Sequence, residues 1–213
     1  MLAFSKDTVQ MIKQKMEEGL FPQWVMTDPD IYKLEINNVF SRTWHFLGHE
    51  SELKEPGDYV TRWIVHDPVL MVRATDGKIK AFLNSCTHRG VRLCTADCGN
   101  KKTFTCPYHG WTFNLDGELI GVTLGNKVYG EKMKKEEWGL KPIPRLETYR
   151  GLIFANLAPE AMPLKEYLAE MTWYLDILLG RTDQGMEVVG EPQRWVAPGN
   201  WKNTYENFAG DPY

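Results

Sequence analysis

The chain has 213 residues, of which 43% are hydrophobic and 12% aromatic, and its formal net charge is −3. This length is sufficient for one large domain or two modest domains with buried cores. The charge argues against a nucleic-acid-binding protein. No run approaches roughly eighteen apolar residues, which argues against a membrane span, and residues 1–20 lack the apolar core of a signal peptide. We therefore expect a cytoplasmic protein.

Two helices are predicted before residue 40. Between residues 5 and 19, apolar residues recur at helical spacing opposite charged ones. A second helix should begin after Thr27, because Asp28 suits the N-cap and Pro29 suits the first helical position. Neither helix carries a chemical motif, so we expect both to serve packing and subunit contact.

Residues 41–160 predict an antiparallel β domain, because short β-branched and aromatic runs alternate there with turn residues. Asp76-Gly77 and Asp116-Gly117 are typical of hairpin turns, since both pairs tolerate positive φ. The expected strands are WHFLGH at 44–49 and residues 59–65, 69–74, 79–83, 104–106, 111–115, 118–122 and 151–157.

The last fifty residues predict two more helices. Residues 163–180 have leucines and aromatic residues at i, i+3, i+4 and i+7, which indicates one amphipathic helix ended by a glycine. A broken strand is expected over residues 187–196. Asn200 suits the cap of a short final helix, whose buried side we expect to hold Trp201, Tyr205 and Phe208.

The chemistry is concentrated in the stretch NSCTHRGVRLCTADCGNKKTFTCPYHGW, residues 84–111. Cys86 and His88 form a Cys-x-His pair, and Cys106 and His109 form a Cys-x-x-His pair. Two thiolates and two imidazoles on two tight loops can hold a metal centre from two sides.

Tetrahedral Cys2His2 zinc is one alternative for this donor set. In zinc fingers, however, the cysteines form one pair and the histidines another, whereas each loop here supplies one of each. That arrangement favours a [2Fe-2S] cluster with one iron on thiolates and the other on imidazoles. We expect each of the two ligand loops to lie at the end of a hairpin, at the tip of the β domain.

Other residues near these loops have two interpretations. Cys94 and Cys98 are interpreted as free thiols, with an extra metal site as the alternative. Four basic residues flank the loops and are interpreted as a solvated rim, or alternatively as a docking surface for an acidic electron donor; they are Arg89, Arg92, Lys101 and Lys102. The remaining histidines, His45, His49 and His66, are interpreted as structural.

These motifs resemble the Rieske family. Respiratory Rieske proteins carry an additional cysteine in each loop, and the corresponding positions here are Val91 and Tyr108. CTHRG followed by CPYHGW resembles instead the alpha subunits of Rieske non-haem iron ring-hydroxylating oxygenases. The resemblance implies an α+β fold with a helical segment (1–40) packing on the catalytic domain, an antiparallel β Rieske domain (41–160), and the truncated start of an α+β catalytic domain (161–213).

The end of the chain, NWKNTYENFAGDPY, extends this resemblance. In these subunits an EN-x-x-x-D-x-Y-H segment opens the mononuclear iron site, and Glu206, Asn207, Asp211 and Tyr213 match it. The resemblance implies that Asp211 accepts an N–H from His109 of another protomer and leads on to the iron, and that Asn207 lies close to that iron. Pro212 disfavours a helical conformation at Asp211, so the helix should end there.

The resemblance implies a terminal oxygenase of an aromatic-ring-hydroxylating dioxygenase system. NAD(P)H would supply electrons indirectly, through a reductase or a ferredoxin, to the cluster at Cys86, His88, Cys106 and His109. A mononuclear non-haem Fe(II), whose ligands this chain lacks, would activate dioxygen against a small aromatic substrate. A homotrimer is expected, with or without a beta subunit. The alternative is a stand-alone Rieske electron carrier without oxygenase activity.

Overall fold

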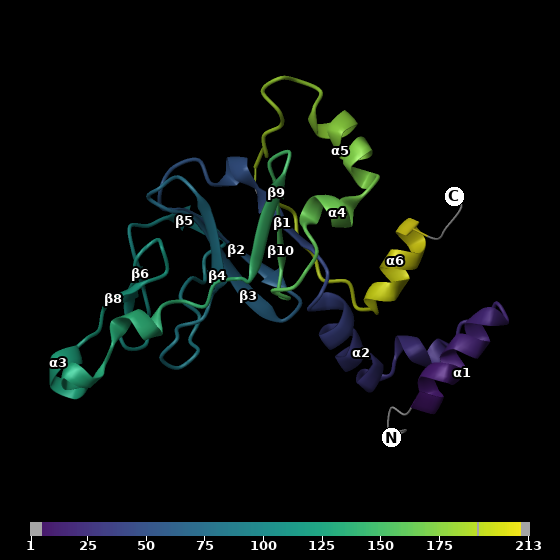
Figure 1. Ribbon diagram of the computed structural model, residues 1–213, viewed down its shortest axis with the longest axis horizontal. Coiled ribbons are helices and arrows are strands. Elements are labelled where there is room, and N and C mark those ends of the chain that lie inside the picture. The colour runs from purple at the N-terminus through teal and green to yellow at the C-terminus, as the bar shows by residue number, and fades with distance from the viewer. Residues whose placement is uncertain (1–5, 191, 210–213) are drawn as a thin grey trace. The chain divides into compact units, whose positions relative to one another are not determined.

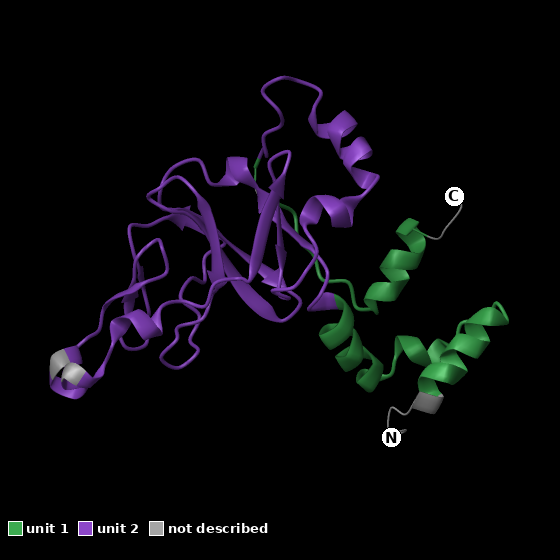
Figure 2. Cartoon of the chain, viewed as in Figure 1, with its two compact units in different colours: residues 1–39, 190–213 green, residues 40–189 purple. Residues whose placement is uncertain are grey.

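The computed structural model describes residues 6–190 and 192–209 (Figure 1). The chain divides into two compact units, residues 40–189 and the combination of 1–39 with 190–213 (Figure 2). The unit of residues 40–189 therefore includes the helices near residue 170 together with the β sheets. The three-domain division expected from the resemblance remains a prediction.

Three antiparallel sheets make up most of the larger unit. The first has the order β1 (His45–His49), β10 (Leu152–Asn156), β9 (Arg145–Tyr149). The second has the order β4 (Ile79–Leu83), β3 (Asp67–Arg73), β2 (Asp58–Ile64), β5 (Cys98–Asn100). The third has the order β6 (Phe104–Thr105), β7 (Thr112–Phe113), β8 (Leu119–Gly121). These results confirm the predicted β domain and add two strands, β5 and β9, that the sequence pattern did not indicate.

The Asp-Gly turns form as predicted. Gly77 between β3 and β4 has φ +78°, and Gly117 between β7 and β8 has φ +81°. Gly117 is also constrained by packing, because a Cβ there would lie 2.4 Å from the ring of Phe82. Glycine alone meets both conditions without strain.

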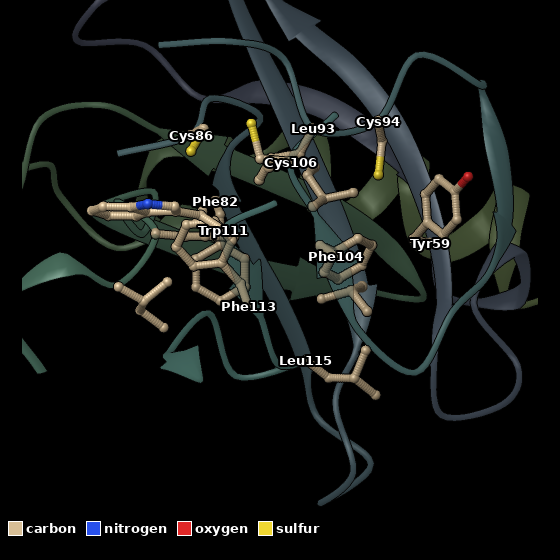
Figure 3. Close-up of a cluster of buried hydrophobic side chains, with 14 residues drawn as sticks. Tyr59, Phe82, Cys86, Leu93, Cys94, Phe104, Cys106, Trp111, Phe113 and Leu115 are labelled. Atoms are coloured by element: carbon tan, nitrogen blue, oxygen red, sulfur yellow. The ribbon is translucent and has the colours of Figure 1, made fainter. Parts of the chain in front are cut away.

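Side chains of the central sheet alternate between two cores, as the period of two in a strand requires. On β3, Val69 and Met71 enter one core with Leu47 and Ile153 of the first sheet. Leu70 enters the other core, which carries the candidate ligands. That second core includes Tyr59, Val72, Phe82, Cys86, Leu93, Cys94, Phe104, Cys106, Trp111, Phe113 and Leu115 (Figure 3). The same strands that stabilise the unit therefore form the floor beneath the ligand loops.

The single helix expected over 163–180 is in fact two, α4 (Leu164–Leu168) and α5 (Met171–Leu179). Ala169 between them has φ +45°. The two helices are attached separately, since Leu164 N donates to Glu147 at 2.9 Å, whereas Asp176 of α5 accepts from Tyr149 Oη at 2.9 Å and Arg150 Nε at 2.7 Å. The change of backbone direction at Ala169 lies between these two attachments. The predicted end at Gly180 is confirmed.

The expected strand at 187–196 is wrong for the residues that the structure describes. Residues 187–190 and 192–196 are irregular, and Val189 and Val196 are 94% and 95% exposed. A strand needs a partner for its backbone groups, and no described strand pairs with this segment. Short helical turns connect the remaining elements: η3 (Glu50–Glu52), α3 (Gly125–Val128), η4 (Gly130–Lys132) and η5 (Lys135–Trp138).

The smaller unit is helical. It contains α1 (Lys6–Glu17), η1 (Gln23–Met26), α2 (Pro29–Glu35) and α6 (Trp201–Ala209), and the π-helical turn η2 (Ile36–Phe40) follows α2. Asp28 caps α2 as predicted, accepting from the amides of Asp30 at 2.8 Å and Ile31 at 3.2 Å. Asn200 accepts from the amide of Lys202 at 3.0 Å at the start of α6. None of the helices in the described ranges is long and apolar enough to cross a membrane.

The buried face predicted for α6 is only partly correct. Trp201 is half-buried, and its indole N–H donates to Glu35 of α2 at 2.8 Å. Tyr205 and Phe208 are 64% and 83% exposed. Helical spacing shows which residues share a face, but it does not show what covers that face.

Candidate metal centre

Two backbone hydrogen bonds close each ligand loop, and they recur at identical spacing. In the first loop the amide of Gly90 donates to the carbonyl of Cys86 at 2.7 Å, and the amide of Cys86 donates to Val91 at 2.8 Å. In the second loop Gly110 donates to Cys106 at 3.0 Å, and Cys106 donates to Trp111 at 2.7 Å. Each cysteine is thus bonded to the residues four and five positions later. Both glycines have positive φ, +74° and +69°, which suits the tight turns that their sequence predicted.

The two loops are attached to the fold in different ways. The second loop joins β6 to β7, which pair antiparallel, so it lies at the end of a hairpin as predicted. The first loop follows β4, but the next strand, β5, pairs with β2. The expectation that both loops lie at hairpin ends is therefore wrong for the first. Its two ends are held together by Asn84, which bonds to the backbone of Leu93 and Cys94.

The loops bring the two candidate cysteines together. Cys86 and Cys106 are 2% and 3% exposed, they belong to the same core cluster, and the Cys106 thiol is near enough to contribute to the raised pKa of Cys86. Burial raises the pKa of the Cys86 thiol and Cys106 adds to this, whereas the backbone N–H groups of His88 and Arg89 donate to its sulfur and lower the pKa. Figure 3 shows the two sulfurs side by side near Trp111, with Cys94 farther away next to Tyr59. A bound metal displaces the thiol protons, and the two N–H donors are suitably placed for the resulting thiolate.

The two candidate histidines form a second pair. Their ring centroids are 4.8 Å apart, at an interplanar angle of 65°. Burial, the His109 ring and the Arg89 charge all lower the pKa of His88, which favours the neutral imidazole that a metal requires. Nδ1 of His109 is buried and has no hydrogen-bond partner in the described part of the chain. A buried polar atom without a partner is costly, and an iron ion would satisfy it.

A cysteine pair beside a histidine pair suits a binuclear cluster. A [2Fe-2S] cluster requires two pairs of donors, one for each iron. The pairing of the donors therefore fits that cluster better than the zinc alternative, and the unpartnered His109 nitrogen is available to either metal.

Aromatic side chains surround the histidines. The His88 ring stacks on Trp111 with centroids 4.6 Å apart and planes 7° from parallel, and Tyr108 lies 3.7 Å from the His109 ring, centroid to centroid. The Tyr129 hydroxyl is 3.5 Å from Nε2 of His88. Sequence reasoning assigned no role to Trp111, Tyr129 or Asn84. For Trp111, the signal in the sequence was the Gly-Trp pair that follows the second Cys-x-x-His motif.

The other candidates lie away from the two ligand pairs. Cys94 is buried, which raises the pKa of its thiol, and Cys98 is exposed on β5; neither forms a disulfide. His45 Nε2 contacts the Phe40 carbonyl at 2.5 Å, and His49 Nδ1 accepts from the amide of Ser51 at 3.1 Å, as structural residues would. His66 lies in the turn between β2 and β3.

The structure describes the four basic rim residues, but it describes only part of the C-terminal segment that was predicted to lead to the mononuclear iron. Arg92 lies over the Trp63 ring at 5.6 Å, and Lys101 lies over the Tyr59 ring at 5.7 Å. All four rim residues are exposed, which fits both interpretations of the rim. Asn207 is exposed on α6. Asp211 and Tyr213 lie outside the described residues, so their predicted roles remain predictions.

Comparison with known proteins defines the class of this domain. Residues 43–132 match the Rieske [2Fe-2S] domain. The chain is 47% identical to the benzene 1,2-dioxygenase subunit alpha of Pseudomonas putida over 89% of this chain and 42% of that protein. It is 37% identical to an N,N-dimethyl phenylurea N-demethylase subunit alpha from Sphingobium sp. over 99% of this chain and 46% of that protein.

The structural comparison agrees. Naphthalene 1,2-dioxygenase from Rhodococcus sp. matches with a TM-score of 0.92 and 43% identity, over 99% of this chain and 49% of that one. The chain thus carries a Rieske [2Fe-2S] domain, and over most of its length it is related to the alpha subunits of ring-hydroxylating dioxygenases. It spans less than half the length of these relatives.

Proposed function

We propose that the intact protein is the terminal oxygenase component of an aromatic-ring-hydroxylating dioxygenase system, and that this chain supplies its electron-relay centre. The observation that carries the proposal is the convergence of Cys86 with Cys106 and of His88 with His109 from two loops of matching geometry. When bound, a [2Fe-2S] cluster accepts and releases single electrons. Relatives that match most of the chain are named as dioxygenase alpha subunits, which favours an oxygenase over a stand-alone carrier.

The cysteine pair and the histidine pair would each hold one iron of the cluster. The cysteine pair would bind one iron, and the burial of both sulfurs would keep water from the thiolates. The histidine pair would bind the other iron, through rings that are only half-buried. Because this side is nearer to solvent, electrons would enter or leave through the imidazoles. The exposed basic residues Arg89 and Arg92 lie on the same loop as His88 and would attract an acidic ferredoxin or reductase domain, which passes on electrons from NAD(P)H.

The remainder of the reaction would take place beyond the cluster. By the family resemblance, Asp211 leads from His109 of one protomer to a mononuclear Fe(II) of its neighbour, Asn207 lies near that iron, and the subunits form a trimer, with or without a beta subunit. The substrate would be a small aromatic molecule together with dioxygen. After His109 the sequence contains no further histidine, so this chain does not supply the histidine ligands of that iron.

Anaerobic reconstitution of the 213-residue chain with iron and sulfide tests the proposal. We expect about two irons and two acid-labile sulfides per chain, a Rieske-type paramagnetic resonance spectrum after reduction, and oxidation of a reduced ferredoxin. The chain by itself should hydroxylate no aromatic substrate. Bound zinc without acid-labile sulfide would refute the cluster assignment. Hydroxylated product formed by this chain alone would show that the oxygen chemistry does not require residues outside the chain.

A further inference from the structure

The two ligand loops are connected by an aromatic contact. The four cysteines form no disulfide, so no covalent bond joins the loops. His88 of the first loop lies flat on the indole of Trp111, the residue that follows the second loop, at 4.6 Å and 7°. Trp111 is 2% exposed and belongs to the core beneath the loops. The plane of the His88 ring is therefore set by a side chain that is itself fixed in the core.

Two further aromatic residues hold the indole from its edges. Tyr129 meets Trp111 at 6.3 Å and 83°, and Trp138 meets it at 5.5 Å and 80°. Edge-to-face contacts of this kind are the favoured geometry for aromatic rings, worth about 0.5–1.5 kcal/mol each. Both residues come from the segment between β8 and Leu140. These neighbours, together with the burial of Trp111, restrict rotation of the indole away from His88.

The same segment also contacts the first loop directly. The Thr87 hydroxyl donates to the carbonyl of Trp138 at 2.7 Å, and the Tyr129 hydroxyl is 3.5 Å from Nε2 of His88. Since Tyr129 occupies the Nε2 side of the ring, Nδ1 is the nitrogen left to bind iron, as it is in His109, whose buried Nδ1 has no partner among the described residues. With Nδ1 on the metal, Nε2 would carry the hydrogen and would donate a hydrogen bond to the Tyr129 oxygen.

We propose that Trp111 and Tyr129 are positioning residues for His88, which fix its ring plane and its Nε2–H bond and thereby set the reduction potential of the cluster. The proposal rests on the proposed function, because it requires a bound cluster. An imidazole whose outer N–H is hydrogen-bonded is a more basic ligand. It stabilises the oxidised iron, so this contact lowers the potential. The stack limits rotation about the metal–nitrogen bond and keeps the contact in place.

Substitution of Trp111 in the full chain tests the stack. Trp111→Leu removes it, Trp111→Phe keeps a flat ring, and Phe104→Leu is a matched control that removes a buried aromatic residue of the same core whose ring contact is with Tyr59. Iron and sulfide content, the paramagnetic resonance spectrum and the midpoint potential are measured for each reconstituted protein. We expect a shifted potential and altered g-values in Trp111→Leu, values near wild type in Trp111→Phe, and wild-type values in Phe104→Leu.

Tyr129→Phe removes one hydroxyl from a half-buried side chain and leaves the core intact. We expect full cluster content and a more positive midpoint potential, because the outer N–H loses its acceptor. If Trp111→Leu loses the cluster, the Tyr129→Phe potential decides: a more positive value supports the proposal, and a wild-type value overturns it. Wild-type potentials in both Trp111→Leu and Tyr129→Phe would overturn it. Failure of the proposed function itself would be seen earlier, as a wild-type chain that binds no cluster.

Discussion

Asn84 and Cys94 join the two ends of the first ligand loop. The Asn84 amide donates to the Cys94 carbonyl at 2.7 Å, and its oxygen accepts from the amides of Cys94 at 3.0 Å and Leu93 at 3.1 Å. Asn84 is only 1% exposed, so these three hydrogen bonds have no competition from water. They take the place of the strand pairing that holds the second loop.

We expect Asn84→Ala to lower the free energy of unfolding by roughly 3 kcal/mol, because it leaves buried backbone groups of Leu93 and Cys94 without a partner. Urea unfolding of the full chain measures this. Asn100→Ala is the control, since Asn100 is exposed and also makes side-chain hydrogen bonds, to Pro56 and Asp58; it should cost less than about 1 kcal/mol. Equal losses in the two variants would show that Asn84 does not hold the loop.

Features that depend on nearby residues could be predicted from the sequence. The cap at Asp28 and the turns at Gly77 and Gly117 each involve residues within four positions of one another, and all three formed as predicted. The convergence of Cys86 with Cys106 could also be predicted, because the chemistry of a shared metal demands it. Such features carry their own physical requirement in the local sequence.

Features that depend on distant partners could not be predicted. Asn100 of β5 pairs with Asp58 across the sequence, and nothing in the short Cys98–Asn100 segment indicates a strand. The break at Ala169 depends on the separate attachments of α4 and α5 to the β9–β10 hairpin. The role of Trp111 appears only when the first loop is placed over it. Each of these features depends on a contact between segments that are distant in sequence, and no sequence pattern indicates that those segments meet.

His109 provides the most direct test of the ligand assignment. His109→Ala removes an expected iron ligand whose Nδ1 is buried without a partner in the described residues, so reconstitution should give an altered or lost cluster spectrum and less iron per chain. His66→Ala is the control, because His66 is exposed in the β2–β3 turn; it should bind the cluster as the wild type does. A normal cluster spectrum in His109→Ala would contradict the assignment.

The attachment of α5 should depend on pH. The Arg150 guanidinium and then the Tyr149 hydroxyl hold the pKa of the Asp176 carboxyl below its usual range. Because the folded-state pKa is lowered, the contribution of this carboxylate is complete above the unfolded value, about 3.9, and is lost as pH falls through the lower folded value. The amides of Met171–Leu179 should therefore exchange hydrogen faster near pH 3 than expected from the intrinsic pH dependence of exchange.

Asp176→Asn separates this attachment from general acid unfolding. The variant should show faster exchange in α5 already at pH 7, and no further loosening specific to α5 as the pH falls. Amides of β3, which belongs to the buried central sheet, provide the internal reference. If β3 loosens together with α5 in the wild type, the pH effect is global and the role assigned to Asp176 is wrong.

The link to the mononuclear iron depends on Asp211, and an intact subunit is needed to test it. Asp211→Asn keeps the shape of the side chain but removes the charge that would accept an N–H from His109 of the neighbouring protomer. Partners of metal-bound histidines typically contribute 10–100-fold to activity, so product formation should fall by about that factor. Because Asp211 is not an expected ligand of the cluster, the paramagnetic resonance spectrum should show an assembled cluster.

Asp183→Asn is the control for this substitution: Asp183 lies at an exposed turn, and its change should leave turnover unchanged. Wild-type turnover in Asp211→Asn would exclude Asp211 from the electron path. The assignment of the four cluster ligands would stand, because it does not depend on Asp211.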